Sequence, residues 1–317
     1  MSKVVGLKIG TALLALWGVA SLIFFLFTVL PGDPAQMMLD QNEDSKQLEV
    51  IKAKFGFDLP ISTQYFNYIN DLLPISIHSK NPTDFGFYDQ EVYGGLILVE
   101  MTHWSIVVKA PYFRTSYQKR GKPITEIIKE TLPNTALLAL SSMSIAVLLG
   151  ISLGIVATLN KNNWIDRFLQ LFSTLGMSVP SFFSAILFSW FFGYVLYDFT
   201  GLNMTGSLYE LDDLGEGLHL QWKNLILPSF VLGIRPLAVI IQLLRSNLLE
   251  VLSEDYIRTA YAKGLSRYKV ILKHALKNSL NPVITAISGW FASLLAGSIF
   301  VEYIFGWKGL GKEIVEA

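Results

Sequence analysis

Few side chains in this sequence have the types and spacing that enzymatic chemistry requires. The 317 residues include no cysteine, which excludes disulfides, thiolate nucleophiles and cysteine-ligated metals. The four histidines lie far apart, without the spacing of a metal site: His78, His103, His219 and His274. There is no GxxxxGK(S/T) phosphate loop, no HExxH and no GxSxG nucleophile elbow. We therefore expect no enzyme, no metal and no cofactor in this chain, and nucleotide hydrolysis would need another protein.

One charged side chain stands inside an otherwise apolar run. Leu225–Leu244 is long enough to cross a membrane, and Arg235 lies about ten residues into it. An arginine at mid-span costs roughly 2.5–3.5 kcal/mol on insertion scales, so it should face a water-filled cavity, a partner helix or a carboxylate. Snorkelling to an interface and a structural ion pair with another subunit are the alternatives. Arg235 is therefore our candidate for a charge that lines a cavity.

A basic, helix-patterned segment, Leu248–Pro282, lies between two apolar runs. From Arg245 to Lys277 the sequence has seven Lys and Arg residues against three Asp and Glu residues. Apolar or small residues recur every four positions, which predicts one face of a helix: Leu252, Tyr256, Ala260 and Gly264. The glycine at the end of this series can adopt the left-handed conformation that ends a helix.

A second helix is predicted directly after this turn. Ser266 is placed to be its N-cap, and its apolar side would carry Val270, Ile271, Ala275 and Leu276. A helix, a Gly-Leu-Ser turn and a helix between two membrane spans can dock on a cytosolic protein and pass movement into the spans. Its position between spans explains its charge, so we do not expect this segment to bind nucleic acid.

The elements that hold these residues are predicted to be membrane helices. The chain is 52% hydrophobic and 16% charged, whereas a soluble domain is about a quarter charged. Apart from Arg235, five long runs lack acidic and basic residues and can each span the bilayer: Ile9–Leu30, Thr131–Asn160, Phe168–Tyr197, Leu225–Leu244 and Ser279–Val301. We therefore predict an all-α polytopic membrane protein with five spans.

Proline and glycine mark local features inside these runs. Pro180 predicts a kink in the third run, and Arg235–Pro236 is expected to interrupt the fourth. Gly150 and Gly154 have the spacing that lets another helix approach closely, although glycine is also simply common in membrane helices.

Residues 31–130 form the largest polar region and are predicted to be an extracytoplasmic lobe of mixed structure. A helix is expected at Ser45–Phe55, and an aromatic, β-prone part lies near Phe85–Tyr117. A short amphipathic helix at Ile124–Leu132 would lead into the next span. The expected organisation is thus an N-terminus with the first span, the lobe and a membrane core, at 1–30, 31–130 and 131–317.

The distribution of basic residues predicts the orientation in the membrane. Short cytoplasmic loops are enriched in Lys and Arg. If the five spans alternate, three basic segments fall on one side: Lys3 with Lys8, the Lys161–Arg167 turn, and Arg245–Lys277. The lobe and the acidic Asp198–Lys223 loop fall on the other. We therefore expect a cytosolic N-terminus and helix pair, with the lobe outside.

The segment Asp255–Leu265 resembles a motif of a known family. Inner-membrane permease subunits of binding-protein-dependent ABC importers carry a cytosolic Glu-Ala-Ala-x-x-x-Gly motif before the penultimate span. Arg258–Gly264 occupies the matching positions; its first two residues differ from the consensus, but the surrounding string is similar to the dipeptide, oligopeptide and nickel branch. Further stretches agree in the same order: Leu30–Pro34, Leu132–Thr135, His274–Pro282 and Val301–Gly311.

The resemblance implies a type I permease-like helical bundle and covers about 120–317 well and 1–75 moderately. Two departures stand out. Residues about 80–110 are extra outside sequence of unknown role. The family also has a sixth span and a cytosolic C-terminus, whereas this chain stops about fifteen residues after its fifth span. We therefore expect a truncated or split version of the family's bundle.

In this family the motif is a coupling helix that seats in a groove of a separate ATP-binding subunit. The resemblance therefore implies that the coupling residues lie within 248–282, namely Asp255, Tyr256, Arg258, Thr259, Ala260, Lys263, Gly264 and Leu265. Leu252, Tyr256 and Ala260 would provide the apolar stripe that the partner buries. Arg235, Glu302 and Asp33 are the candidates for the translocation pathway or for contact with a partner outside.

The implied function is that of a permease subunit in the inner membrane, moving a solute inward by alternating access. Its partners would be ATP-binding subunits, a second homologous permease, an extracytoplasmic solute-binding protein and the lipid bilayer. Peptides, nickel or another small solute are all open as substrates. A stand-alone channel or secondary transporter, and a membrane scaffold, are the competing classes.

Overall fold

The computed structural model describes residues 2–29, 35, 45–119, 121–211 and 217–316. The chain divides into two compact units, Met1–Ile127 and Ile128–Ala317. The boundary falls close to the predicted end of the lobe at residue 130. The first span, which we predicted as a part of its own, belongs to the same unit as the lobe.

The first unit begins with the long apolar helix α1 (Ser2–Val29), which matches the predicted first span. Its apolar side chains are largely exposed, as expected of a helix whose solvent is lipid. The lobe helix α4 (Ile61–Leu72) contacts α1 near its end. There the hydroxyl groups of Ser21 and Tyr65 are hydrogen bonded at 2.7 Å, and the Phe24 ring packs on Tyr65.

The lobe has mixed structure, as predicted. Helix α3 (Ser45–Phe55) has the bounds expected from the sequence, and a single short helical turn, α5 (Gln90–Tyr93), follows later. A three-stranded antiparallel sheet has the order β1-β3-β2 and contains β1 (Ile75–Ser79), β2 (Leu96–Glu100) and β3 (Trp104–Val108). Strands β2 and β3 lie in the predicted β-prone part, whereas β1 lies before it, where no strand is predicted.

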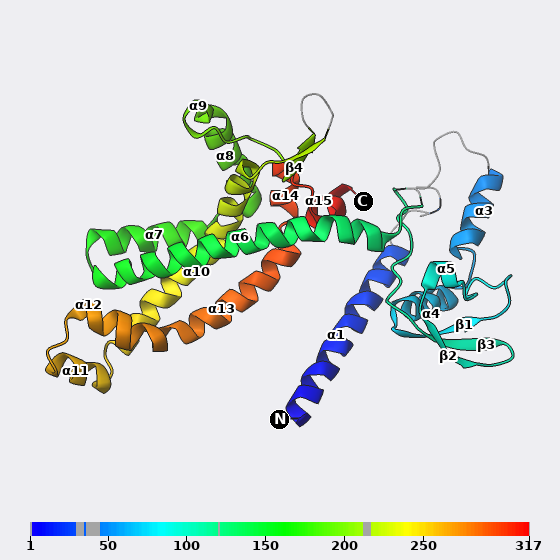
Figure 1. The fold of residues 1–317 in the computed structure, drawn as a ribbon, viewed down its shortest axis with the longest axis horizontal. Coiled ribbons are helices and arrows are strands. Elements are labelled where there is room, and N and C mark those ends of the chain that lie inside the picture. The colour runs from blue at the N-terminus through cyan, green and yellow to red at the C-terminus, as the bar shows by residue number, and fades with distance from the viewer. Residues whose placement is uncertain (1, 30–34, 36–44, 120, 212–216, 317) are drawn as a thin grey trace. The chain divides into compact units, whose positions relative to one another are not determined.

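The second unit consists mainly of long helices (Figure 1). Its first half contains α6 (Ile124–Leu159), α7 (Trp164–Ser178), α8 (Ser181–Trp190), the π-helix η1 (Phe191–Val195), α9 (Tyr197–Thr200) and the hairpin of β4 (Tyr209–Leu211) and β5 (Leu218–Leu220). Its second half contains α10 (Lys223–Val251), α11 (Asp255–Ala262), α12 (Arg267–Val270), the π-helix η2 (Ile271–Ala275), α13 (Leu276–Gly297), α14 (Ile299–Phe305) and α15 (Leu310–Glu316).

Helix α10 is the centre of this unit and packs against both α7 and α13. Its apolar residues Ile240, Leu244 and Leu248 are fully buried. Helix α6 approaches α10 closely at the two glycines singled out in the sequence. A Cβ added to Gly150 would lie 2.7 Å from Ile240 Cγ2, and one added to Gly154 would lie 3.1 Å from Leu244 Cβ. The prediction of close helix packing at these glycines is confirmed.

Among the described residues, four helices are long and apolar enough to cross a membrane, and a bent pair can form a fifth span. The four are Lys3–Thr28, Ile124–Leu159, Lys223–Val251 and Arg267–Ala296. The pair is Trp164–Ser178 with Ser181–Val195, which meet at an angle of 109°. This agrees with the five apolar runs of the sequence, although Pro180 accompanies a sharp bend between two helices rather than a kink within one.

Two further predictions about helix boundaries are wrong. No separate helix covers Ile124–Leu132, because α6 continues through Pro133 to Leu159. Arg235–Pro236 does not interrupt its span, since α10 runs through both of its prolines. Proline within a membrane helix is tolerated when neighbouring helices and local adjustments satisfy the freed carbonyl groups.

Candidate coupling segment and translocation face

The helix pair predicted from the sequence is present, with the turn at the expected glycine. Helix α11 ends in the Schellman arrangement, in which Gly264 N–H bonds Tyr261 O at 2.9 Å and Leu265 N–H bonds Ala260 O at 3.4 Å. Gly264 has a φ of +77°, the left-handed conformation that glycine adopts without strain. Ser266 then occupies the N-cap position of α12, as predicted, although its side chain makes no capping bond.

The predicted apolar stripe is wrong in two respects. Helix α10 ends at Val251, so Leu252 belongs to its C-terminal cap and not to the helix of Tyr256. On α11 the buried residues are Ile257 and Ala260, which pack within this chain, while Tyr256 is 43% exposed. The buried side of α11 therefore holds the segment on its own bundle, and Ala260 is not free for a partner.

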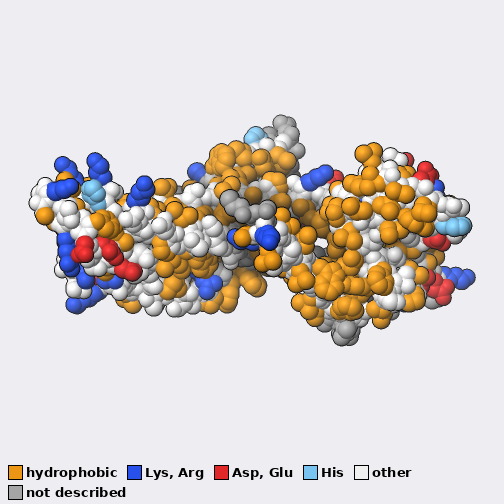
Figure 2. Space-filling model, turned by 90° about the horizontal axis from the view of Figure 1, so that it is seen from below, with side chains coloured by type: hydrophobic (Ala, Val, Ile, Leu, Met, Phe, Trp, Pro, Cys, Tyr) orange, Lys and Arg blue, Asp and Glu red, His pale blue; other side chains and the backbone are white. Residues whose placement is uncertain are grey.

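The opposite side of α11 is polar and exposed. Asp255, Arg258, Thr259 and Lys263 all face solvent, and the ion pair from Arg258 Nη1 to Asp255 Oδ1 spans 3.2 Å at the surface. Such an exposed pair contributes little stability, about 0–1 kcal/mol, so these charges are available to a partner. Figure 2 shows Lys and Arg side chains gathered at the end of the second unit that α11 and α12 form.

Two connections join this segment to the last long helix. Helix α12 continues through η2 into α13 with little interruption, so that Arg267–Ala296 qualifies as one span. Its predicted apolar residues Val270, Ile271 and Ala275 are fully buried. In addition, Asn278 Nδ2 at the start of α13 donates to the hydroxyl of Tyr256 at 2.8 Å. Movement of α11 would therefore act directly on the base of α13.

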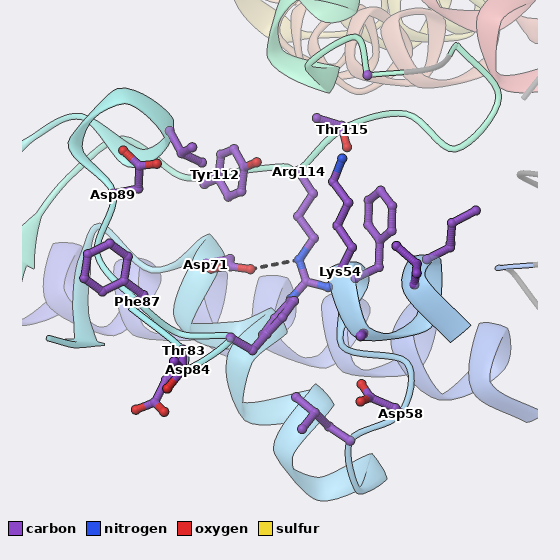
Figure 3. A pocket seen from close by; sticks show the side chains of 18 of the residues that line it. Lys54, Asp58, Asp71, Thr83, Asp84, Phe87, Asp89, Tyr112, Arg114 and Thr115 are labelled. Atoms are coloured by element: carbon purple, nitrogen blue, oxygen red, sulfur yellow. Dashed lines mark hydrogen bonds and ion pairs between the residues drawn. The ribbon is translucent and has the colours of Figure 1, made fainter. Parts of the chain in front are cut away.

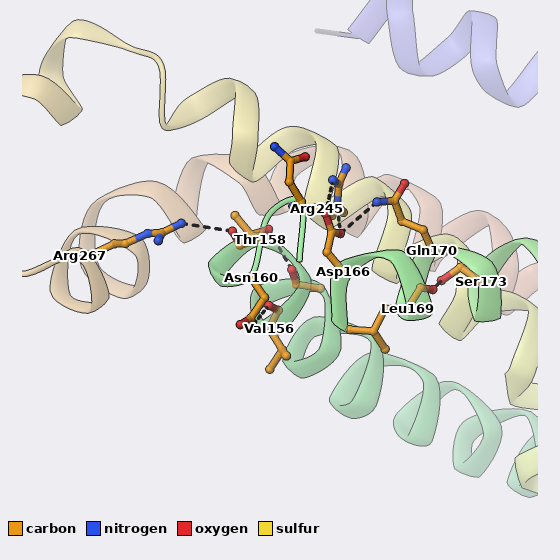
Figure 4. Close-up of polar contacts among 11 residues, drawn as sticks. Val156, Thr158, Asn160, Asp166, Leu169, Gln170, Ser173, Arg245 and Arg267 are labelled. Carbon is orange, nitrogen blue, oxygen red and sulfur yellow. Dashed lines mark hydrogen bonds and ion pairs between the residues drawn. The ribbon is translucent and has the colours of Figure 1, made fainter. Parts of the chain in front are cut away.

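A buried ion pair that we did not predict fixes the neighbouring helix ends (Figure 4). Arg245 near the end of α10 donates from Nε and Nη2 to the two carboxylate oxygens of Asp166 at 2.5 and 2.7 Å. The Asn162 amide and the Gln170 side chain also donate to this carboxylate, which is 1% exposed. Both charges stand at the borders of apolar runs, the only signal in the sequence that could have drawn attention to them.

A further contact extends this arrangement to the helix pair itself. Arg267 Nη2 at the start of α12 donates to the carbonyl oxygen of Thr158 at 3.4 Å. Thr158 closes the last turn of α6 and bonds Gly154 O through its hydroxyl at 2.9 Å. The ends of α6, α7 and α10 and the start of α12 are thus connected by polar contacts at one end of the bundle (Figure 4).

Arg235 lies on an exposed side of α10. Its Nη2 donates to the carbonyl oxygen of Met177 at 3.3 Å, at the end of α7 beside the sharp bend. A cation at a helix C-terminus stabilises carbonyl groups that have no partner within the helix. No ion pair of Arg235 with a carboxylate occurs in the described part of the chain. The arginine therefore has a structural contact and still presents its charge outside its own bundle.

Glu302 is in different surroundings from those expected of a pathway residue. It is 0% exposed, and its carboxylate accepts from the hydroxyls of Thr135 and Ser298 and from the amides of Gly311 and Lys312, at 2.5–3.2 Å. These donors join α6, α14 and α15 around one buried charge. In this chain Glu302 organises the bundle and reaches no open space, whereas Asp33 lies outside the described residues.

A polar stripe on α13 was not predicted. Four exposed side chains are spaced by three or four residues and therefore share one face of the helix: Asn278, Asn281, Thr285 and Ser288. Polar side chains in a membrane helix face a partner helix or a water-filled cavity rather than lipid. This face is uncovered in the single chain and begins at the residue that bonds Tyr256.

These features define a class of protein. A bundle of membrane helices with an uncovered polar face and an exposed charged helix pair is built as one subunit of a larger transport assembly. The comparison with known families agrees. Residues 146–317 match the family described as binding-protein-dependent transport system inner membrane component, and residues 1–83 match its N-terminal family.

The chain belongs to this family of ABC importer permeases, in the branch that includes the peptide and nickel systems. It is similar to the glutathione transport system permease protein GsiC of Salmonella typhimurium strain LT2, with 32% identity over 299 residues, 94% of this chain and 81% of the relative. The protein of the same name from Escherichia coli strain K12 is 31% identical over 300 residues, with the same coverage. The chain is therefore a multi-pass inner-membrane transport component rather than an enzyme.

Proposed function

We propose that this chain is the permease subunit of an importer that moves short peptides inward by alternating access. Separate ATP-binding subunits would drive it by docking on Asp255–Leu265, with the exposed residues Asp255, Tyr256, Arg258, Thr259 and Lys263 at the contact. Glutathione is a tripeptide, and the name of the relatives supports a solute of this class. Nickel, the other solute of the branch, is the competing candidate for the solute.

The observation that carries the coupling proposal is the path from α11 to α13. The outer side of α11 is charged and free, its inner side is packed on the bundle, and Tyr256 is bonded to Asn278. A partner that moves α11 therefore moves the start of the helix that carries the polar stripe. Shifting a two-state equilibrium from 1:99 to 99:1 needs about 5.5 kcal/mol of differential interaction, which a docked ATP-driven partner can supply.

The pathway in this proposal runs along the polar stripe of α13. A second homologous permease would face this stripe across the pathway, because one chain leaves it uncovered. Arg235 presents a charge outside the bundle and is our candidate for attracting a peptide carboxylate. The N-terminus and α11 would lie in the cytosol, and an extracytoplasmic solute-binding protein would deliver the peptide on the side of the lobe.

Uptake in proteoliposomes that contain the chain with its ATP-binding and permease partners tests the coupling. Gly264→Pro distorts the turn, and Arg258→Glu reverses an exposed charge of α11. Both should abolish peptide-stimulated ATP hydrolysis and uptake. Lys161→Glu, in the exposed α6–α7 turn on the same side, is the matched control and should keep both. Normal ATP hydrolysis and uptake in Gly264→Pro and Arg258→Glu would contradict the docking proposal. Uptake without any ATP-binding subunit would favour a stand-alone channel or secondary transporter.

A further inference from the structure

The lobe contains a large cavity that the transport proposal does not use. It has a volume of about 1180 Å³ and lies entirely within the first unit, so it is large enough for a solute of drug or peptide size. Figure 3 shows that its charged and aromatic side chains come from several elements of the lobe. Those that the argument uses are Lys54 on α3, Phe85, Asp84 and Asp89 around the β1–α5 loop, and Tyr112 and Arg114 after β3.

One part of the lining is cationic. Arg114 is anchored because its Nε donates to Asp71 Oδ2 at 2.8 Å and its guanidinium lies 5.6 Å from the centroid of the Phe85 ring. Its Nη2 has no hydrogen-bond partner among the described residues. Lys54 extends from α3 toward the same space (Figure 3), and no carboxylate pairs with it in the described part of the lobe. The exposed Lys54 ammonium is thus left for a carboxylate, while the buried Nη2 of Arg114 adds positive charge behind it.

The anchor of this cationic part is itself rigid. Asp71 is 5% exposed, and its carbonyl oxygen accepts from Lys109 Nζ at 2.5 Å and from the Tyr112 amide at 2.8 Å. Arg114 has a φ of +62°, which is uncommon for a residue with a side chain. A site whose charged group is held in place before binding loses less conformational entropy when a solute arrives.

Another part of the lining is acidic. Asp84 accepts from Ser79 Oγ at 2.6 Å, and Asp89 caps α5 by accepting from the Glu91 amide at 2.9 Å. Neither carboxylate is paired with a cation among the described residues. In Figure 3 they lie on the other side of the Asp71–Arg114 pair from Lys54. Aromatic rings, Phe85 and Tyr112 among them, also line the cavity.

We infer that this cavity is a second solute site, outside the membrane, that binds a short zwitterionic peptide. The peptide carboxylate would contact Lys54, its ammonium group would contact Asp89, and its side chains would pack on the aromatic rings of the lining. The four carboxylates of the lining repel a solute that carries only negative charge, and its three cationic residues repel a solute that carries only positive charge. The inference rests on the proposed function for its solute class.

Calorimetric titration of the purified full chain, without partners, tests this site with trialanine as the probe. Acetylated trialanine amide is the matched probe, because it has the same side chains and no terminal charges. Lys54→Gln and Asp89→Asn each remove one charge, and Asn can still cap α5. Each variant should weaken trialanine binding about tenfold or more, as expected for the loss of a charged hydrogen bond, and the uncharged probe should bind weakly to all forms.

Controls separate this site from the bundle and from the transport proposal. Lys80→Gln and Glu91→Gln remove lobe charges outside the cavity lining, and both variants should bind trialanine as the parent chain does. Unchanged binding in Lys54→Gln and Asp89→Asn would overturn the lobe site. ATP-driven uptake by the full assembly reports on the transport proposal independently, so either proposal can fail while the other stands.

Discussion

Single residues in this chain divide into those that hold the bundle and those that face a partner. Tyr256 belongs to both groups, because its ring is half exposed on α11 and its hydroxyl accepts from Asn278 of α13. Glu302 belongs only to the first group. A buried carboxylate with four donors is strongly stabilised, and the same four donors would be left unsatisfied without it.

Tyr256→Phe removes one hydroxyl and keeps the ring. The lost hydrogen bond is worth about 0.5–1.5 kcal/mol, so we expect docking to persist while less of each ATP-driven movement reaches α13. The measurement is the number of peptides taken up per ATP hydrolysed in the reconstituted assembly, which should fall. Tyr261→Phe, on an exposed side of the same helix, is the control. If both variants take up the same number of peptides per ATP hydrolysed, the Tyr256–Asn278 hydrogen bond does not transmit movement to α13.

We expect His78 to make the stability of the lobe depend on pH. Burial and the nearby Lys109 lower the pKa of His78 below its ordinary value of 6.5, against a raising effect of Asp71. Below pH 6.5, His78 therefore binds a proton in the unfolded lobe but not in the folded lobe. The free energy of unfolding decreases as the pH falls through 6.5 toward the lower pKa that His78 has in the folded lobe. Tyr88 and Tyr93 pack on the ring and carry no charge that would oppose this.

The expected result is faster proteolytic cleavage within the lobe as the pH is lowered from about 7.5 to 5.5. His78→Gln should flatten this dependence, because glutamine does not titrate. His103→Gln, in the turn between β2 and β3, is the matched control and should keep the parent profile. Identical pH profiles for the parent chain and for His78→Gln would rule out this histidine as the source.

At the scale of elements, features that depend on neighbouring residues could be predicted from the sequence. Contacts between residues far apart in the chain could not. The bounds of α3 and the left-handed Gly264 depend on neighbouring residues alone, and both were predictable. The prediction that Leu252 to Gly264 share one helix face is wrong, because residues spaced by four turn about 40° further around the axis at each step on a helix of 3.6 residues per turn. The Asp166–Arg245 pair joins residues 79 positions apart and depends on how α7 packs on α10.

The approach of α6 to α10 predicts a sharp effect of added volume. Gly150→Leu would place its Cβ within 2.7 Å of Ile240, so overpacking should destabilise the bundle by about 1–3 kcal/mol. Thermal unfolding of the purified chain in detergent measures the loss. Gly18→Leu, on α1 with nothing within 4 Å of its Cβ, should leave the transition unchanged. Ile240→Ala should partly rescue Gly150→Leu, and a variant as stable as the parent would contradict the packing described here.

The buried pair at the end of α10 predicts strong coupling between two substitutions. Removing one partner leaves a buried charge alone, so Asp166→Ala or Arg245→Ala should each cost about 3–5 kcal/mol. The double variant leaves neither charge alone and should cost much less than the sum of the two. Unfolding of all four forms completes the cycle, and strictly additive losses would show that the pair contributes no interaction of its own.

At the scale of the whole molecule, the chain is one subunit that needs others. Its bundle leaves the polar stripe of α13 and the charged side of α11 uncovered, and its described residues include no nucleotide-binding loop. The sequence predicted the family and the five apolar runs because membrane spans and the coupling motif are local patterns. It did not predict the uncovered stripe, since which side of α13 stays free depends on how α13 packs on α10.

In the proposed mechanism, an ATP-binding partner binds α11, and the movement of α11 displaces α13. Since the chain has no native cysteine, Lys263→Cys provides a unique thiol on the exposed side of α11 for a photoactivatable cross-linker. We predict that illumination joins this position to the ATP-binding subunit and abolishes peptide uptake, whereas the same label on Lys161→Cys gives neither result. A Lys263→Cys label that captures no ATP-binding subunit, or a cross-linked assembly that still takes up peptide, would contradict the account.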